Sequence, residues 1–184
     1  MLSNYNVPRA TGRVTMGPFN DGRAVMCARI ASPCVGLCST TLGDPICRGC
    51  QRTDSEIGEW MALTVEQRSQ RMAQLDTLRE RVAGCFLQVE DEALLEAQLR
   101  RYRIRFRPEQ PPLSRAVELL RVGRDRIRDL SRYGLRPLEG GAELSAAELY
   151  ARLGERLLEA AGEREAANRA PTPDPDSHDL EYRA

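Results

Sequence analysis

Four cysteines that could bind a metal lie close together near the start of the chain. They occur as Cys34-x3-Cys38 and Cys47-x2-Cys50, two short-spaced pairs separated by eight residues. Each pair can wrap one side of a tetrahedron, which is what a four-thiolate metal site requires. Gly49, inside the second pair, tolerates a positive φ and leaves room for backbone N–H groups to approach sulfur. We therefore predict one metal centre bound by these four cysteines.

The residues around the cysteines extend this pattern. Pro33 precedes the first pair, Arg52 follows the second, and Glu56 and Trp60 come next in the order Glu-Ile-x2-Trp. The stretch from about residue 32 to 81 resembles a small bacterial family known as domain of unknown function 1289, whose members are often labelled predicted iron–sulfur proteins. The resemblance implies a metal centre but carries no settled biochemical role.

The metal is either zinc or the iron of an iron–sulfur cluster. The cysteine spacing falls in the range of structural zinc sites, whereas clustered ferredoxin runs place three cysteines at two-residue spacing. The family label instead favours iron–sulfur. Four thiolates leave negative charge, so nearby donors are expected. We assign that role to Arg48, Gly49 and Arg52, and expect Trp60 to cover the site. The only histidine, His178, lies in the C-terminal tail, which favours an all-thiolate site.

The cellular compartment determines whether these four cysteines bind metal or form disulfide bonds. No apolar run approaches the roughly 20 residues of a membrane span, and the first 26 residues lack the apolar core of a secretory signal. We expect a cytoplasmic protein in which clustered cysteines stay reduced and bind metal, with disulfide bonds as the alternative. Cys27 is expected to be a bystander. We expect Cys85 to be a small buried apolar residue, with a fifth ligand or a redox thiol as the alternative.

The periodicity of the chain predicts a mostly α-helical protein. A four-cysteine metal-binding module with two helices is expected over residues 30–86, followed by a helical extension over 87–169. Disordered termini are expected over 1–29 and 170–184, because proline and glycine or acidic residues dominate there. Since Met26 precedes the family match, the first segment is alternatively a misassigned start.

Helix starts are marked by three capping boxes. They pair Thr53 with Glu56, Thr64 with Gln67, and Ser145 with Glu148. Further helices are expected over about 90–101 and 114–133, from apolar residues at three- and four-residue spacing. Residues 100–107 alternate Arg with apolar or aromatic side chains, which fits a half-exposed strand, unless the preceding helix runs on to Phe106.

Charge is distributed unevenly although the formal net charge is zero. Residues 100–136 hold twelve arginines against four acids, and residues 139–184 hold eleven acids against five arginines. The basic segment and its aromatic rings could bind nucleic acid. The candidate surface consists of Arg101, Arg103, Arg105 and Arg107. Pairing of the basic helices with the acidic ones is the alternative that we favour.

No catalytic set is evident in the sequence. It has no Gly-rich phosphate loop, no nucleophile elbow and no His–acid pair outside the tail, so we expect neither an enzyme nor a small-molecule substrate. A closed four-thiolate site is structural or electron-carrying, because catalytic zinc usually keeps a position for water. We expect a regulator or adaptor with a structural or redox-sensing centre, which binds a protein partner or nucleic acid. The alternative is an iron–sulfur electron carrier that serves an oxidoreductase.

Overall fold

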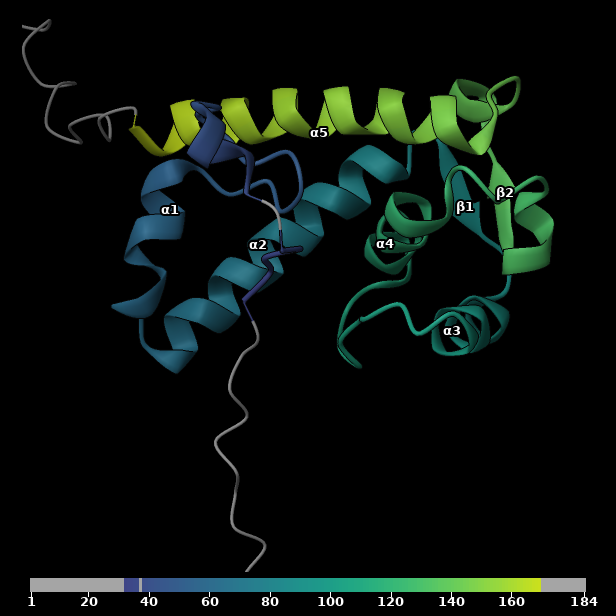
Figure 1. The fold of residues 1–184 in the computed structure, drawn as a ribbon, viewed down its shortest axis with the longest axis horizontal. Coiled ribbons are helices and arrows are strands. Elements are labelled where there is room, and N and C mark those ends of the chain that lie inside the picture. The colour runs from purple at the N-terminus through teal and green to yellow at the C-terminus, as the bar shows by residue number, and fades with distance from the viewer. Residues whose placement is uncertain (1–31, 37, 170–184) are drawn as a thin grey trace, which may run out of the picture.

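The computed structural model describes residues 32–36 and 38–169. The predictions made for residues 1–29 and 170–184, and for Cys27 and His178, lie outside these described ranges. Within them the protein is mostly helical, as expected (Figure 1). The helices are α1 (Asp54–Gly58), α2 (Val65–Ala83), α3 (Glu92–Arg101), α4 (Pro112–Gly123) and α5 (Ala146–Arg169), and the strands are β1 (Leu87–Val89) and β2 (Leu135–Pro137).

The three predicted capping boxes are all present. At α1 the Thr53 hydroxyl accepts from the Glu56 N–H at 3.2 Å, and the Glu56 carboxylate accepts from the Thr53 N–H at 3.0 Å. The same reciprocal pair occurs at the start of α2 and of α5. Each box satisfies backbone donors that a helix start leaves unpaired. Local sequence therefore determines where these three helices begin.

The longest helix, α5, runs along one side of the molecule and joins its two ends (Figure 1). α2 packs against both α4 and α5, while α4 also contacts α3, α5 and β1. α5 contributes Leu149, Leu153 and Leu157 to one buried cluster, at the four-residue spacing of a helix face. Ile46, between the two cysteine pairs, belongs to the same cluster. The core therefore crosses residue 86, where the sequence predicts a boundary between two units.

A small sheet lies beside α4, and the sequence did not predict it. β1 and β2 pair antiparallel, with Leu87 opposite Pro137 and Val89 opposite Leu135. Gly134 precedes β2 with a φ of +71°, and its carbonyl accepts from the N–H groups that follow β1. Residues 134–141 thus hold β2 and a short 3-10 helix at Glu139–Gly141.

The helix expected over about 114–133 differs from the observed one. α4 begins at Pro112, a residue that suits the first turn because it lacks an N–H, and it ends at Gly123. Ser114 does not cap this helix; its buried hydroxyl donates to Asp76 at 2.8 Å. A separate 3-10 helix at Leu130–Tyr133 follows, capped by Asp129. Gly123, which lies in the middle of the predicted helix, is therefore the last residue of the observed helix α4.

Residues 100–107 form neither of the two predicted structures. α3 ends at Arg101, and residues 102–107 are irregular. Arg103 adopts a φ of +56°, which breaks both a helix and a strand. The chain turns here so that Ile104 enters the core.

Cys85 is exposed, so the prediction of a buried residue was wrong. It follows Gly84, which ends α2, and its Sγ lies 3.5 Å from the Arg81 carbonyl.

Among the described residues no helix is long and apolar enough to cross a membrane.

Candidate metal centre

The second cysteine pair lies on a tight hairpin. The Cys47 N–H donates to the Arg52 carbonyl at 2.8 Å, and the Gln51 N–H donates to the Cys47 carbonyl at 2.9 Å. Gln51 closes the turn with a φ of +59°. Cys47 and Cys50 are buried to 2% and 1% exposure. Two thiols are thereby held on one short turn, out of contact with solvent.

Backbone donors converge on the Cys47 sulfur. Burial raises the pKa of the Cys47 thiol, but hydrogen bonds from the backbone of Cys50, Ser39 and Gly49, and from the Cys50 thiol, outweigh it and lower the pKa to about 7. Burial raises the pKa of Cys50, opposed by hydrogen bonds from Arg52. N–H groups that point at sulfur stabilise a thiolate, which is the form that binds metal.

The first cysteine pair lies on the neighbouring loop. The Cys34 sulfur accepts from the Gly36 N–H at 3.4 Å, in a turn that Gly36 closes with a φ of +105°. The Cys38 sulfur lies 3.1 Å from the Thr40 hydroxyl. Cys38 precedes Ser39, whose backbone is hydrogen-bonded to the Cys47 sulfur and whose hydroxyl accepts from the Arg48 N–H. The Cys38 segment therefore lies against the hairpin.

Four cysteine thiols are chemically suited to a thiophilic metal, but the structure does not bring the four sulfurs together around one point. In residues 32–36 and 38–169, no three His, Cys, Asp or Glu side chains form a group that could hold a metal ion. Cys47 and Cys50 are paired and supplied with N–H donors, as metal-binding thiolates are. Cys34 and Cys38 lie on the adjoining loop with their sulfurs hydrogen-bonded locally. Binding by all four cysteines stays a prediction.

Of the predicted supporting residues, Arg52 contacts a cysteine and Trp60, whereas the Arg48 side chain points to solvent. The Arg52 Nε donates to the Cys50 sulfur at 3.4 Å, and its Nη2 donates to the Ser32 hydroxyl at 3.3 Å. The Arg52 guanidinium stacks 4.8 Å above the ring of Trp60, which is buried. The Arg48 side chain is 71% exposed and pairs with Asp44 instead. The Arg52 side chain therefore contacts the hairpin, the first cysteine loop and Trp60.

Gly49 is needed for space and not for its backbone angles. The positive φ of the hairpin belongs to Gln51, and that of the first loop belongs to Gly36. A Cβ on Gly49 would lie 2.4 Å from Cγ2 of Val35. The expectation of a positive φ at Gly49 was therefore wrong, and its role is to let the first loop approach the hairpin.

Sequence reasoning missed the buried polar residues that bind the hairpin to the body. The Arg79 Nε donates to the Gln51 side chain at 2.9 Å, and its Nη1 donates to Glu118 at 3.1 Å. Glu56 accepts from Arg71 at 2.6 Å and from Arg164 of α5 at 2.7 Å. These partners are far apart in sequence, and no short-range pattern marks them.

The predicted nucleic-acid surface is partly engaged within the protein. Arg107 pairs with Asp76 of α2, and other arginines of residues 100–136 pair with acids of the body. Those pairs are Arg100–Glu96, Arg115–Glu92, Arg115–Glu96, Arg121–Glu118, Arg124–Asp125 and Arg136–Glu90. Three acids of α5, Glu155, Glu159 and Glu165, pair instead with arginines of α5 itself. Six of the twelve arginines of this segment therefore pair with acids, and, contrary to the expectation, none of these acids belongs to the acidic helix.

Residues 32–79 match the family described as "Protein of unknown function (DUF1289)". This confirms the resemblance inferred from the cysteine spacing and the residues that follow it. The match spans both cysteine pairs, α1 and α2 as far as Arg79. No curated protein and no solved structure matches the chain.

Proposed function

We propose that residues 32–53 bind one metal centre through Cys34, Cys38, Cys47 and Cys50, and that the centre serves a structural or redox-sensing role in a regulator or adaptor. One observation carries the proposal: the Ser39 backbone that hydrogen-bonds the Cys47 sulfur brings the Cys38 segment to a pair of buried thiols. The Arg52 guanidinium beside Cys50 and the N–H groups on Cys47 offset the negative charge of thiolates.

The surroundings favour a holding role over catalysis. Arg52 contacts Cys50, Ser32 and Trp60 at once, so it keeps the first loop and the covering ring in fixed positions around the thiols. Trp60 excludes water from this side of the hairpin because its ring is buried under the guanidinium. A bound four-thiolate centre would supply folding free energy to the two loops. Four protein thiolates leave no position for a reacting water.

Metal content of the full chain purified without oxygen, measured with its visible spectrum, tests the proposal. We expect one zinc or one iron–sulfur cluster per chain; a brown protein favours electron transfer, and a colourless one with zinc excludes it. Cys47→Ser should lose the metal and melt like chelator-treated wild type. Cys85→Ser is the matched control, since Cys85 is exposed and outside the loops, and it should keep metal and melting temperature. A metal-free wild type that melts like Cys47→Ser refutes the proposal.

A further inference from the structure

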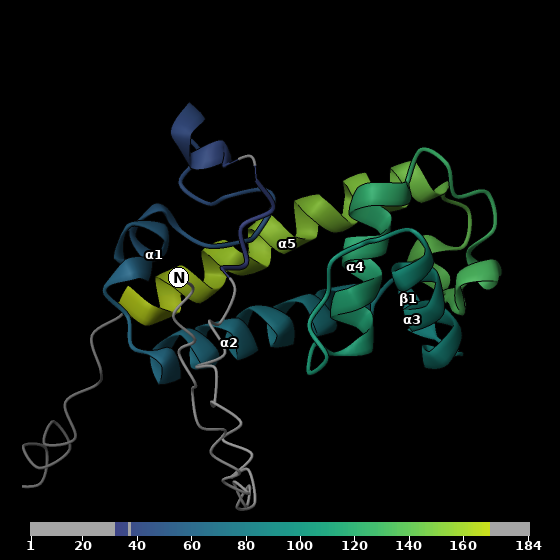
Figure 2. The same ribbon diagram turned by 60° about the horizontal axis from the view of Figure 1, so that its bottom comes forward.

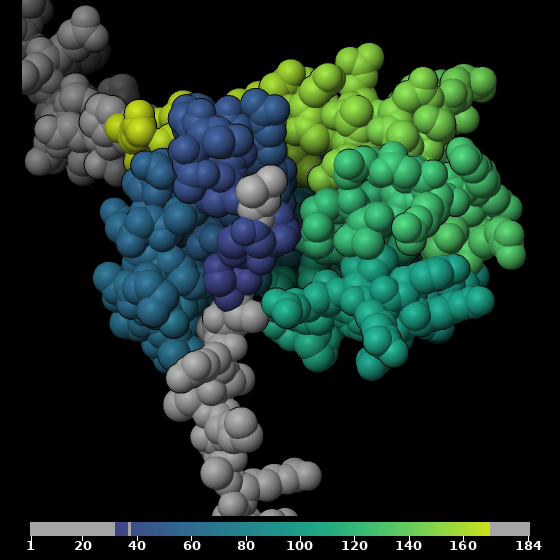
Figure 3. Space-filling view, in the orientation of Figure 1, coloured from purple at the N-terminus to yellow at the C-terminus, as the bar shows by residue number. Residues whose placement is uncertain are grey.

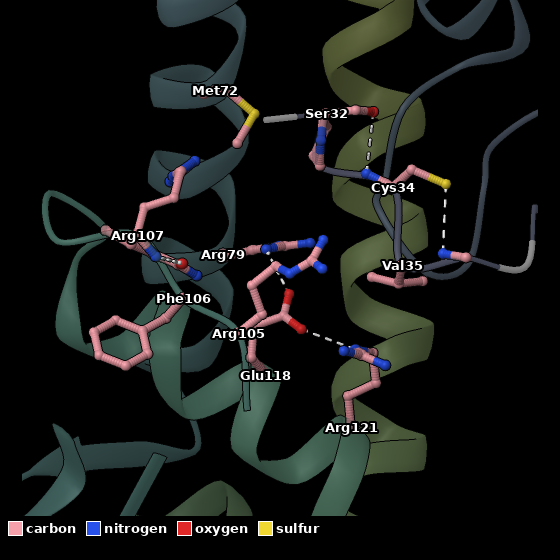
Figure 4. Close-up of a pocket in the computed structure, with 13 residues that line it drawn as sticks. Ser32, Cys34, Val35, Met72, Arg79, Arg105, Phe106, Arg107, Glu118 and Arg121 are labelled. Atoms are coloured by element: carbon pink, nitrogen blue, oxygen red, sulfur yellow. Dashed lines mark hydrogen bonds and ion pairs between the residues drawn. The ribbon is translucent and has the colours of Figure 1, made fainter. Parts of the chain in front are cut away.

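A cavity of about 380 Å³ lies between the first cysteine loop and the helical body. Residues 32–36 form one wall, and α2, α4 and the segment 105–110 form the other (Figure 4). The space-filling view shows residues 32–36, in purple, at the junction of the blue and teal parts of the surface (Figure 3). The turned view shows the next segment, residues 39–42, standing out from the body above α5 (Figure 2). The cavity volume falls in the range of small-molecule sites, about 300–1,000 Å³.

The lining is strongly cationic. Four guanidinium groups, from Arg79, Arg105, Arg107 and Arg121, line the cavity together with one carboxylate, Glu118 (Figure 4). That carboxylate is already occupied: Glu118 accepts from Arg79 at 3.1 Å and from Arg121 at 2.8 Å. Arg79 also donates to the Gln51 side chain and to the Gly49 carbonyl, so it is largely satisfied. Arg121 donates to Glu118 through Nε, which leaves most of the five N–H donors of its guanidinium without a hydrogen bond to the described residues.

The other two arginines carry unmatched donors. Arg107 contacts Asp76 and Glu109, which do not line the cavity; its buried Nε lies 3.5 Å from the Glu109 carboxylate and makes no hydrogen bond in the described part of the chain. Arg105 is exposed, and no ion pair links it to an acid of residues 32–36 or 38–169. One net positive charge remains even when all three acids are counted. A buried N–H that lacks a hydrogen bond and an uncompensated positive charge both favour an anionic occupant.

The remaining lining is apolar on the side of α2 and the segment before α4. Met72 and Phe106 line this part, and Val35 faces it from the cysteine loop (Figure 4). The occupant therefore combines an anionic group with an organic part. Phosphate suits several guanidinium forks better than one carboxylate does, because it offers three oxygens and carries close to two charges near neutral pH.

We propose that this cavity binds a small phosphorylated organic molecule. Its phosphate lies among the side chains of Arg79, Arg105, Arg107 and Arg121, and its organic part lies against Met72 and Phe106. The site adjoins the predicted metal centre, because Cys34 lies in its wall. The proposal does not require a metal, but it requires that residues 32–36 keep their place.

Calorimetric titration of the full chain with phenyl phosphate, at constant ionic strength, tests this site. We expect one site, with benzoate binding more weakly. R105Q should raise the Kd for phenyl phosphate about tenfold or more, the loss expected for one charged hydrogen bond. R103Q is the matched control: it removes the same charge two residues away, from a side chain that does not line the cavity, and should change Kd less than about twofold.

The outcomes separate the alternatives. Absence of phenyl phosphate binding, benzoate binding of equal strength, or equal effects of R105Q and R103Q overturns the proposal. Tight binding of a short oligothymidylate that both variants weaken equally indicates a nucleic-acid surface and also overturns it. Metal content is measured in each sample, so a metal-free protein that binds phenyl phosphate refutes the metal centre while supporting this site.

Discussion

Replacing Glu56 by Gln tests whether buried charge pairs hold the candidate metal centre to the rest of the protein. Glu56 lies at the third position of α1, only 9% exposed, between Arg71 of α2 and Arg164 of α5. Gln keeps the size of the side chain and its place in the capping box. The chain itself uses Gln in this position, at Gln67 of α2. The substitution therefore removes charge and little else.

The expected loss follows from the contacts. Removing one partner of a buried ion pair costs about 3–5 kcal/mol, and a neutral amide that still accepts hydrogen bonds recovers part of it. Arg164 is a sensitive partner because its Nε and Nη1 are buried with no hydrogen bond in the described residues. We expect Glu56→Gln to lower the free energy of unfolding by about 2–3 kcal/mol. For a chain of this size the melting temperature falls by roughly 5–10 °C.

Thermal and urea unfolding followed by far-UV circular dichroism measure this effect. Glu148→Gln is the matched control, because Glu148 holds the same position in the exposed capping box of α5 and pairs with no arginine there. It should melt within about 2 °C of wild type. Arg164→Gln should resemble Glu56→Gln, with a coupling energy of about 1–2 kcal/mol in the double variant. If Glu56→Gln melts like Glu148→Gln, the buried pairs contribute nothing.

Three further predictions concern glycines. Gly134→Ala should destabilise the protein by at least about 2 kcal/mol, because φ is +71° and a Cβ would lie 2.2 Å from the Asp91 carbonyl oxygen. Gly154→Ala, in the middle of α5, should instead stabilise the protein by about 0.5–1 kcal/mol, because no atom outside the backbone of its own helix lies within 4 Å of the added Cβ. Urea unfolding measures the change in unfolding free energy for both variants. Effects of the same sign and size contradict the reasoning. Gly49→Ala should displace Val35, and the second substitution Val35→Ala should restore the melting curve. A Gly49→Ala protein that melts like wild type, with Val35→Ala adding nothing, contradicts that contact.

Short-range chemistry explains what could be predicted from the sequence. A capping box involves residues three apart, so the sequence predicts the starts of α1, α2 and α5 at Thr53, Thr64 and Ser145. The spacing of two cysteines three or four residues apart likewise determines that they share a turn. Leu149, Leu153 and Leu157 recur at the four-residue spacing of one helix face, and the structure has all three in the core.

Long-range contacts explain what could not be predicted. Whether Gly123 interrupts a helix or ends it depends on Ile127, which folds back to within 3.0 Å of the position of a Cβ on that glycine. The two-stranded sheet joins segments 46 to 50 residues apart, each only three residues long. Arg79 is buried in α2, where Gln51 and Glu118 accept its hydrogen bonds. The tertiary fold determines such hydrogen-bond partners, and the neighbouring residues in the sequence do not predict them.

The first cysteine loop connects the two proposed sites. Residues 32–36 carry Cys34, contact the hairpin through Val35 and Gly49, and form one wall of the cationic cavity. Arg79 makes the second connection, because it bonds Gln51 of the hairpin while it lines the cavity. A metal that holds the loop in place therefore favours the shape that binds the phosphorylated molecule. Thermodynamic linkage then requires that the bound molecule raise metal affinity by the same factor. A shared wall is enough for this coupling, and no movement of the helical body is needed.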